Sequence, residues 1–114
     1  MKDIPQRSFN FALEIIKLSQ LLESKKGTAR ILSSQILRSG TSIGANIEEA
    51  QGSFSKADFT YKYSIACKEA RETYYWLKLL KASDICNDSI HPLIHECNEL
   101  VAILTTSVKK LKEE

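Results

Sequence analysis

The sequence predicts an all-α protein that folds as an antiparallel, up-down-up-down four-helix bundle. Apolar residues recur at helical spacing in four long segments, and only short breaks separate these segments. The 114 residues include only four glycines and two prolines, so the chain has little turn-forming material. Amphipathic helices with short connections pack most simply as antiparallel neighbours around one core. We therefore expect a single domain over residues 1–114, with helices at about 6–24, 28–51, 56–82 and 90–112.

The first helix is expected to end before Gly27, because glycine suits the position just past a helix. Thr28 is then the expected N-cap of the second helix. The inner face of the first helix is expected to consist of Phe9, Ala12, Leu13, Ile16 and Leu22.

The second helix contains the segment LRSGTSIGANIEEA (37–50), in which Gly40 and Gly44 lie one turn apart. The apolar stripe keeps its phase through both glycines, which is typical of a helix and not of a phosphate-binding loop. The segment also lacks the G-x-x-x-x-G-K-[ST] pattern and a preceding strand. Glycine inside a helix costs roughly 1 kcal/mol relative to alanine, so we expect another helix to pack closely here. The stripe consists of Leu32, Ile36, Ile43, Ile47 and Ala50.

The third helix has Ser55 as its expected N-cap, with Asp58 at the third helical position. Its expected core stripe is Phe59, Tyr63, Ala66, Ala70, Thr73, Leu77 and Leu80. A second apolar stripe lies roughly opposite and consists of Tyr61, Ile65, Trp76 and Leu79. Trp76 could lie flat on the surface with its polar tip in water. We favour the other interpretation, a subunit interface, where Trp and Tyr are enriched.

The fourth helix follows a connection at residues 84–89 and carries Pro92 in its first turn, where proline is tolerated. Its expected inner face consists of Leu93, Cys97, Leu100, Val101, Leu104, Val108 and Leu111.

Composition excludes several classes of protein. No apolar run approaches the roughly 18–20 residues of a membrane span, and the N-terminal residues do not resemble a signal peptide. We expect a cytoplasmic protein with no membrane partner, in which Cys67, Cys86 and Cys97 are reduced thiols. The net charge of +2 does not by itself indicate a nucleic-acid binder.

The sequence carries no recognisable catalytic or metal-binding motif. His91, His95 and Cys97 cluster in HPLIHEC, but the order differs from H-E-x-x-H and no third ligand has a convincing spacing. There is no G-x-S-x-G nucleophile elbow. We therefore expect no enzyme, no metal, no cofactor and no small-molecule substrate.

A basic stripe on the third helix is the strongest candidate for a binding site. Four of its residues lie within about 80° of one another on the helical wheel, and a tyrosine among them could stack on a base. The alternative is that these cations only extend their aliphatic stems over the edge of the core. The basic stripe consists of Lys56, Arg71, Tyr74, Lys78 and Lys81.

Residues 34–80 resemble the family of four-helix-bundle proteins encoded in intervening sequences of bacterial 23S rRNA genes. The most specific similarities are the run Arg38–Glu49, SKADF at 55–59 and KEARETYYWLKLL at 68–80. SFNFALEIIKL (8–18) and NELVAILTTSVKK (98–110) resemble the first and last helices of the family, so the resemblance covers nearly the whole chain.

This resemblance implies an antiparallel four-helix bundle and a ring of five subunits. The chain is also similar to the accessory protein of diversity-generating retroelements, a basic pentamer that works with a reverse transcriptase and RNA. By this similarity, the ring would present basic residues to RNA. Two functions remain open: a non-enzymatic, oligomeric RNA-binding or RNA-associated accessory protein, and a homo-oligomeric protein-interaction scaffold that binds no nucleic acid.

Overall fold

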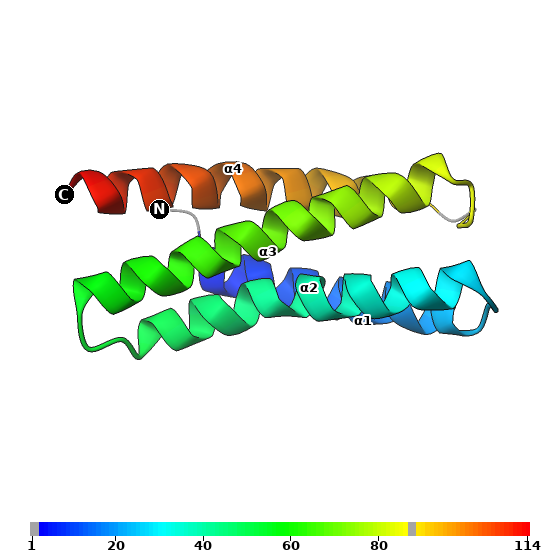
Figure 1. The fold of residues 1–114 in the computed structure, drawn as a ribbon, viewed down its shortest axis with the longest axis horizontal. Helices are drawn as coiled ribbons and strands as arrows, with labels where there is room; N and C mark the ends of the chain where they lie inside the picture. The colour runs from blue at the N-terminus through cyan, green and yellow to red at the C-terminus, as the bar shows by residue number, and fades with distance from the viewer. Residues whose placement is uncertain (1–2, 87–88) are drawn as a thin grey trace.

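The computed structural model describes residues 3–86 and 89–114, and these residues form four helices. The helices are α1 (Ile4–Glu23), α2 (Thr28–Gln51), α3 (Lys56–Ala82) and α4 (His91–Glu113). Each helix runs in the opposite direction to the next one in the chain, as the colour gradient shows (Figure 1). They form an elongated bundle of 46 × 20 × 19 Å. The sequence therefore predicted the all-α four-helix fold correctly, while residues 87–88 of the expected last connection lie outside the described residues.

The N-terminus of α1 is capped by Asp3, whose carboxylate accepts a hydrogen bond from the Gln6 backbone N–H at 3.1 Å. The helix consequently begins at Ile4, earlier than the sequence indicated. Pro5 lies in its first turn, where the missing N–H of proline has no helical partner to lose.

The starts of α2 and α3 differ in how well the sequence predicted them. Gly27, not Thr28, is the N-cap of α2, and its φ of 73° lies in a region that favours glycine. Thr28 is the first helical residue, so its expected role as N-cap was wrong. Ser55 caps α3 as expected, because its Oγ accepts a hydrogen bond from the Asp58 N–H at 3.0 Å.

The inner face of α1 is not the face that the sequence indicated. Phe9, Leu13 and Ile16 are 60%, 45% and 39% exposed, so their expected burial was wrong. Of the predicted set, Leu22 is buried and Ala12 is partly buried. The side chains that α1 does bury belong to Ile4, Ser8, Phe11, Ile15, Leu18, Ser19 and Leu22. Because α1 is apolar on two faces, periodicity alone could not select the buried one.

The inner faces of the other three helices are close to those predicted. All five residues of the α2 stripe are buried, and α2 continues through both glycines without a break. On α3 the predicted core stripe is buried except for Phe59, which is partly buried and stacks on Tyr63 at 4.6 Å between ring centroids. On α4 the buried apolar residues are Cys97, Leu100 and Leu104, with the other four partly buried.

Small residues let α2 lie close to its two neighbours. A Cβ atom on Gly40 would lie 2.8 Å from Ile15 Cγ1 of α1, and one on Gly44 would lie 3.3 Å from the Ser8 carbonyl oxygen. On the other side, the hydroxyl of Thr73 in α3 donates a hydrogen bond to Ser39 Oγ of α2 at 2.8 Å, and both residues are buried. α1 and α4 touch over a much shorter stretch than any pair of helices adjacent in the chain. The bundle is therefore least tightly closed between its first and last helices.

No helix among the described residues combines the length and apolar character that crossing a membrane requires.

Candidate nucleic-acid interface

The basic stripe lies along the seam between α3 and α4, and its residues have different partners. At one end Lys56 Nζ forms an ion pair with Glu114 Oε1 at 2.6 Å, so its charge is already compensated. At the opposite end Lys81 Nζ lies 3.2 Å from His91 Nδ1, within hydrogen-bond distance. The stripe therefore binds α3 to both ends of α4.

Arg71 lies in the middle of this seam. Its Nη2 donates a hydrogen bond to Thr105 Oγ1 of α4 at 3.1 Å, and Cys67 Sγ lies 3.4 Å from the same hydroxyl. The hydroxyl is a neutral partner, so the guanidinium keeps its full charge and most of its donors toward solvent. Arg71 is exposed.

Tyr74 is not placed to stack on a base in the way that the sequence allowed. Lys78 Nζ lies 4.5 Å from the centroid of the Tyr74 ring, within the range of a cation–π contact. The ring is only partly exposed and packs against the core. A base would have to displace the ammonium of Lys78 to reach this face of the ring. The contact instead holds Lys78 in a fixed position on the seam.

The acidic residues in the middle of α3 and α4 face away from this seam. Glu69 and Glu72 of α3 both bind Arg38 of α2, at 3.4 Å for Glu69 Oε1. Glu96 and Glu99 of α4 both bind Arg7 of α1. Among the described residues, Arg71, Lys78 and Lys81 form no ion pair. The α3–α4 seam therefore carries three cations that no carboxylate among the described residues compensates.

The seam widens near the C-terminus of α4 into an open groove of about 630 Å³. Lys56, Tyr61 and Ser64 of α3 line one wall, with Leu111 and Lys112 of α4 on the other. Tyr61 is 61% exposed, so it is the aromatic side chain that this groove offers to a ligand. The sequence did not predict that Tyr61 would line a groove, because it assigned Tyr61 to a subunit interface.

The second apolar stripe of α3 divides into exposed and covered residues. Tyr61 and Leu79 are exposed, whereas Ile65 and Trp76 are partly buried. Trp76 packs against the core and donates from Nε1 to Glu72 Oε2 at 3.0 Å, so its polar group has a partner within α3. This intrachain contact accounts for much of the apolar surface that the sequence assigned to an interface. The role of these four residues in oligomer formation stays a prediction.

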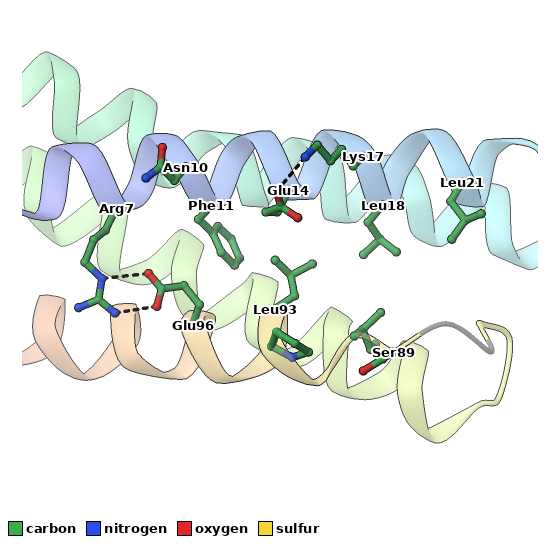
Figure 2. Close-up of a pocket in the computed structure, with 12 residues that line it drawn as sticks. Arg7, Asn10, Phe11, Glu14, Lys17, Leu18, Leu21, Ser89, Leu93 and Glu96 are labelled. Atoms are coloured by element: carbon green, nitrogen blue, oxygen red, sulfur yellow. Dashed lines mark hydrogen bonds and ion pairs between the residues drawn. The ribbon is translucent and has the colours of Figure 1, made fainter.

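Another concavity, with a more apolar lining, lies between α1 and α4 and has a volume of about 570 Å³ (Figure 2). Figure 2 shows Phe11 and Leu18 of α1 and Leu93 of α4 pointing into it. Arg7 closes one end, where Nε donates to Glu96 Oε2 at 2.9 Å and Nη2 donates to Glu96 Oε1 at 2.6 Å. Sequence analysis did not predict this groove, because Arg7 and Glu96 are far apart in the chain and only the fold brings them together.

The histidines and cysteines show no arrangement typical of a metal site. Among the described residues, no three His, Cys, Asp or Glu side chains are placed to hold a metal ion. His95 Nε2 instead lies 3.4 Å from Glu99 Oε2 on the surface. Cys97 is buried and donates from Sγ to the Ala70 carbonyl at 3.4 Å. Burial raises the pKa of this thiol to about 12, so it is protonated and unreactive at neutral pH.

Comparisons with known proteins identify relatives of the whole bundle. A family model described as 23S rRNA-intervening sequence protein matches residues 2–106. No curated protein matches the chain. The chain is similar to a crystal structure from Bacteroides thetaiotaomicron, described as a protein with unknown function from the S23 ribosomal protein family. The two chains are 39% identical, the match covers 93% of this chain and 98% of that one, and the TM-score is 0.83.

Proposed function

Because the chain belongs to the 23S rRNA-intervening sequence protein family, we propose that it is a non-enzymatic, RNA-associated accessory protein that binds RNA along the α3–α4 seam. The observation that carries this proposal is which charged residues form ion pairs. The carboxylates in the middle of α3 and α4 pair with arginines of α2 and α1, whereas three cations at the α3–α4 seam have no carboxylate partner among the described residues. Arg38 and Arg7 neutralise the acidic residues of α3 and α4 on the far sides of these helices. Arg71, Lys78 and Lys81 are left without a carboxylate partner among the described residues, on one straight edge of α3.

This arrangement suits phosphate groups better than bases. Arg71 and Lys81 are ten residues apart, which is about 15 Å along a helix. Each cation that meets a phosphate releases condensed counterions, so affinity arises without base recognition. Tyr74 is covered by Lys78 and adds little stacking surface. Three cations give weak binding for one chain, and an oligomer that repeats the seam would raise the affinity by multivalency.

The test is RNA binding by fluorescence anisotropy with a labelled hairpin RNA, at low and at near-physiological salt. We expect the wild type to bind at low salt and to lose affinity steeply as salt rises. Arg71→Glu with Lys78→Glu should lower the affinity at least about tenfold, because two phosphate contacts become repulsive.

The matched control is Arg30→Glu with Lys26→Glu. It makes the same change in charge at exposed positions near the α1–α2 turn. We expect it to weaken binding only about twofold, through net charge. Equal losses of affinity in both double variants would contradict RNA binding at the α3–α4 seam. The absence of binding by the wild type at low salt would contradict the proposed function.

The second proposal is a homo-oligomeric protein-interaction scaffold without nucleic-acid binding. The observation that favours it is the amount of exposed apolar surface, which includes Tyr61 and Leu79 on α3 and four large side chains on α1. Exposed apolar patches mark interaction sites more often than chance placement. An oligomer that fails to bind the hairpin RNA at low salt would favour this second function.

A further inference from the structure

The solvent side of α3 carries two exposed tyrosines with a lysine between them. Tyr61 and Tyr75 are 61% and 55% exposed, and Lys68 is exposed as well. They follow one another at i, i+7 and i+14, so they lie in one line, with about 10.5 Å of helix between neighbours. This line is opposite the face of α3 that buries Ala66 and Ala70. We call these three residues the outer line of α3.

Both tyrosines of the outer line have aromatic surface to offer a ligand. Tyr61 lies in the wall of the open groove near the C-terminus of α4. Tyr75 contacts Trp76 edge-to-face, with 5.3 Å between the ring centroids, and more than half of its side chain is still exposed. Tyr74, by contrast, packs against the core under the ammonium of Lys78. The outer line therefore supplies the stacking surface that Tyr74 lacks.

Three cations accompany these rings. Lys68 lies on the outer line, and Arg71 and Lys78 lie beside it on the side toward α4. By the helical period, all three are within about 60° of Tyr75 around the helix axis. None of them forms an ion pair within the described part of the chain: Arg71 donates to the neutral hydroxyl of Thr105, and Lys78 lies over an aromatic ring. Their charges are available to an anionic ligand.

The carboxylates on the other side of the outer line are already bound. Glu69 and Glu72 both pair with Arg38 of α2. Glu72 also accepts a hydrogen bond from Trp76 Nε1 at 3.0 Å. These contacts hold both carboxylates toward α2 and neutralise part of their charge. An anion on the outer line therefore meets uncompensated cations on one side and compensated carboxylates on the other.

We propose that the outer line of α3 binds an unpaired, single-stranded stretch of RNA. One base stacks on Tyr61 and one on Tyr75, and the phosphates between them meet Lys68 and Arg71, with Lys78 at the next phosphate. The inference rests on the proposed function and specifies the class of RNA that the cationic side of α3 takes.

The two rings are the reason for a single strand. The bases of a duplex stack on one another, so their faces are closed to side chains, whereas unpaired bases can turn outward and stack on tyrosine. A double helix could contact the three cations but would leave both rings without a partner. A single strand can satisfy both kinds of group along the roughly 21 Å that separate Tyr61 from Tyr75.

The test compares two RNAs by fluorescence anisotropy at low salt: a labelled oligouridine of about 12 nucleotides and a blunt-ended RNA duplex of the same length. We expect the wild type to bind the oligouridine at least about fivefold more tightly than the duplex. Tyr61→Ala and Tyr75→Ala should each lower the affinity for oligouridine at least about fivefold, the loss of one stacked base. Tyr61→Phe and Tyr75→Phe should stay within about twofold of the wild type, because they keep the ring.

Two further variants separate stacking from other effects. Phe9→Ala is the matched control, because Phe9 is a 60% exposed aromatic residue on α1, and it should leave the affinity unchanged. Lys68→Gln should reduce the slope of log affinity against log salt by about 0.7, the value for one phosphate of a single strand, whereas the tyrosine variants should keep the slope of the wild type. Circular dichroism and light scattering establish that each variant keeps the fold and the mass of the wild type.

The results that would overturn the inference differ from those that would contradict RNA binding. Equal or tighter binding of the duplex, or an unchanged affinity for oligouridine in both alanine variants, would overturn the inference and leave RNA binding at the seam intact. An equal loss for Phe9→Ala would also overturn it. A smaller mass for Tyr61→Ala or Tyr75→Ala would assign that tyrosine to a contact between copies of the chain instead of a base. Failure of the wild type to bind either RNA would contradict the proposed function and this inference together.

Discussion

Ile15 of α1 occupies the space that a side chain at position 40 of α2 would need. A Cβ on Gly40 would lie 2.8 Å from Ile15 Cγ1 and 2.9 Å from Cγ2, closer than nonbonded carbon atoms approach. Both residues are buried, and the two contacted carbons are not at the free end of a flexible side chain. The missing side chain of Gly40 therefore sets how closely α1 and α2 approach.

Gly40→Ala should destabilise the fold by about 1–2 kcal/mol. Overpacking a core costs about 1–3 kcal/mol, and the better helix propensity of alanine returns up to about 1 kcal/mol. Urea unfolding measures the change. Combined with Ile15→Ala, the same substitution should cost less than it does alone, because the clashing carbons are gone. Strict additivity of the two variants would contradict the assigned contact.

Gly44→Ala should cost less than Gly40→Ala. The nearest atom to its added Cβ is the Ser8 carbonyl oxygen at 3.3 Å, so a shift of a few tenths of an ångström relieves the contact. The gain in helix propensity then offsets most of the cost, and we expect a change within about 0.5 kcal/mol of zero. The two variants are compared by their urea midpoints. A larger loss at Gly44 than at Gly40 would reverse this order.

Cys97 should make the protein lose stability at alkaline pH. Burial raises the pKa of its thiol from 9.0 to about 12, so above pH 9 the unfolded chain releases a proton that the folded chain retains. The stabilisation is complete below pH 9 and falls as pH rises toward 12, by at most about 1.4 kcal/mol per pH unit.

Cys97→Ala isolates this effect. Burial also raises the pKa of Tyr63, which contributes alkaline destabilisation to both proteins and cancels in the comparison. Free energies of unfolding at pH 8, 9 and 10 should fall less steeply for Cys97→Ala than for the wild type. Parallel curves would mean that the thiol is ionised as easily in the folded protein as in the unfolded chain.

Arg7→Met should destabilise the protein by about 1–2 kcal/mol. The guanidinium donates hydrogen bonds to both Glu96 and Glu99, which raise its pKa, and methionine keeps only the apolar stem. Lys17→Met is the control, because its exposed pair with Glu14 should contribute roughly 0.3 kcal/mol. Thermal unfolding in low and high salt compares them. An equal effect for both would show that the two-carboxylate geometry of Arg7 adds nothing.

Tyr74→Leu should weaken RNA binding much less than Arg71→Gln. The Tyr74 ring lies under Lys78, whereas Arg71 faces solvent with an uncompensated charge. Arg71→Gln should also reduce the slope of log affinity against log salt by about 0.7–0.9, the value for one phosphate contact. Anisotropy titrations at three salt concentrations measure both quantities. A larger loss of affinity for Tyr74→Leu than for Arg71→Gln would indicate that RNA is recognised by base stacking.

The sequence was a good guide to the buried faces of α2, α3 and α4, and a poor guide to the buried face of α1. On α2 a single stripe passes through the glycines and is buried throughout. On α1, Phe9, Leu13 and Ile16 fit a helical period as well as the buried residues do, and the choice depends on which face meets α2. Arg7 and Glu96 meet only through the tertiary fold. By contrast, the cation–π contact of Lys78 with Tyr74 is an i, i+4 pair that the sequence could have revealed.

The arrangement of the seams has a consequence for how the chain folds. Three of the four seams join helices that follow one another directly, and only the loosely closed seam between α1 and α4 joins the two ends of the chain. Most native contacts can thus form after closure of a short loop, which is the condition for low contact order. The chain can form its core as a succession of helical hairpins, and the packing of α1 against α4 is the final step. Helical proteins with such local contacts fold on the order of microseconds to milliseconds.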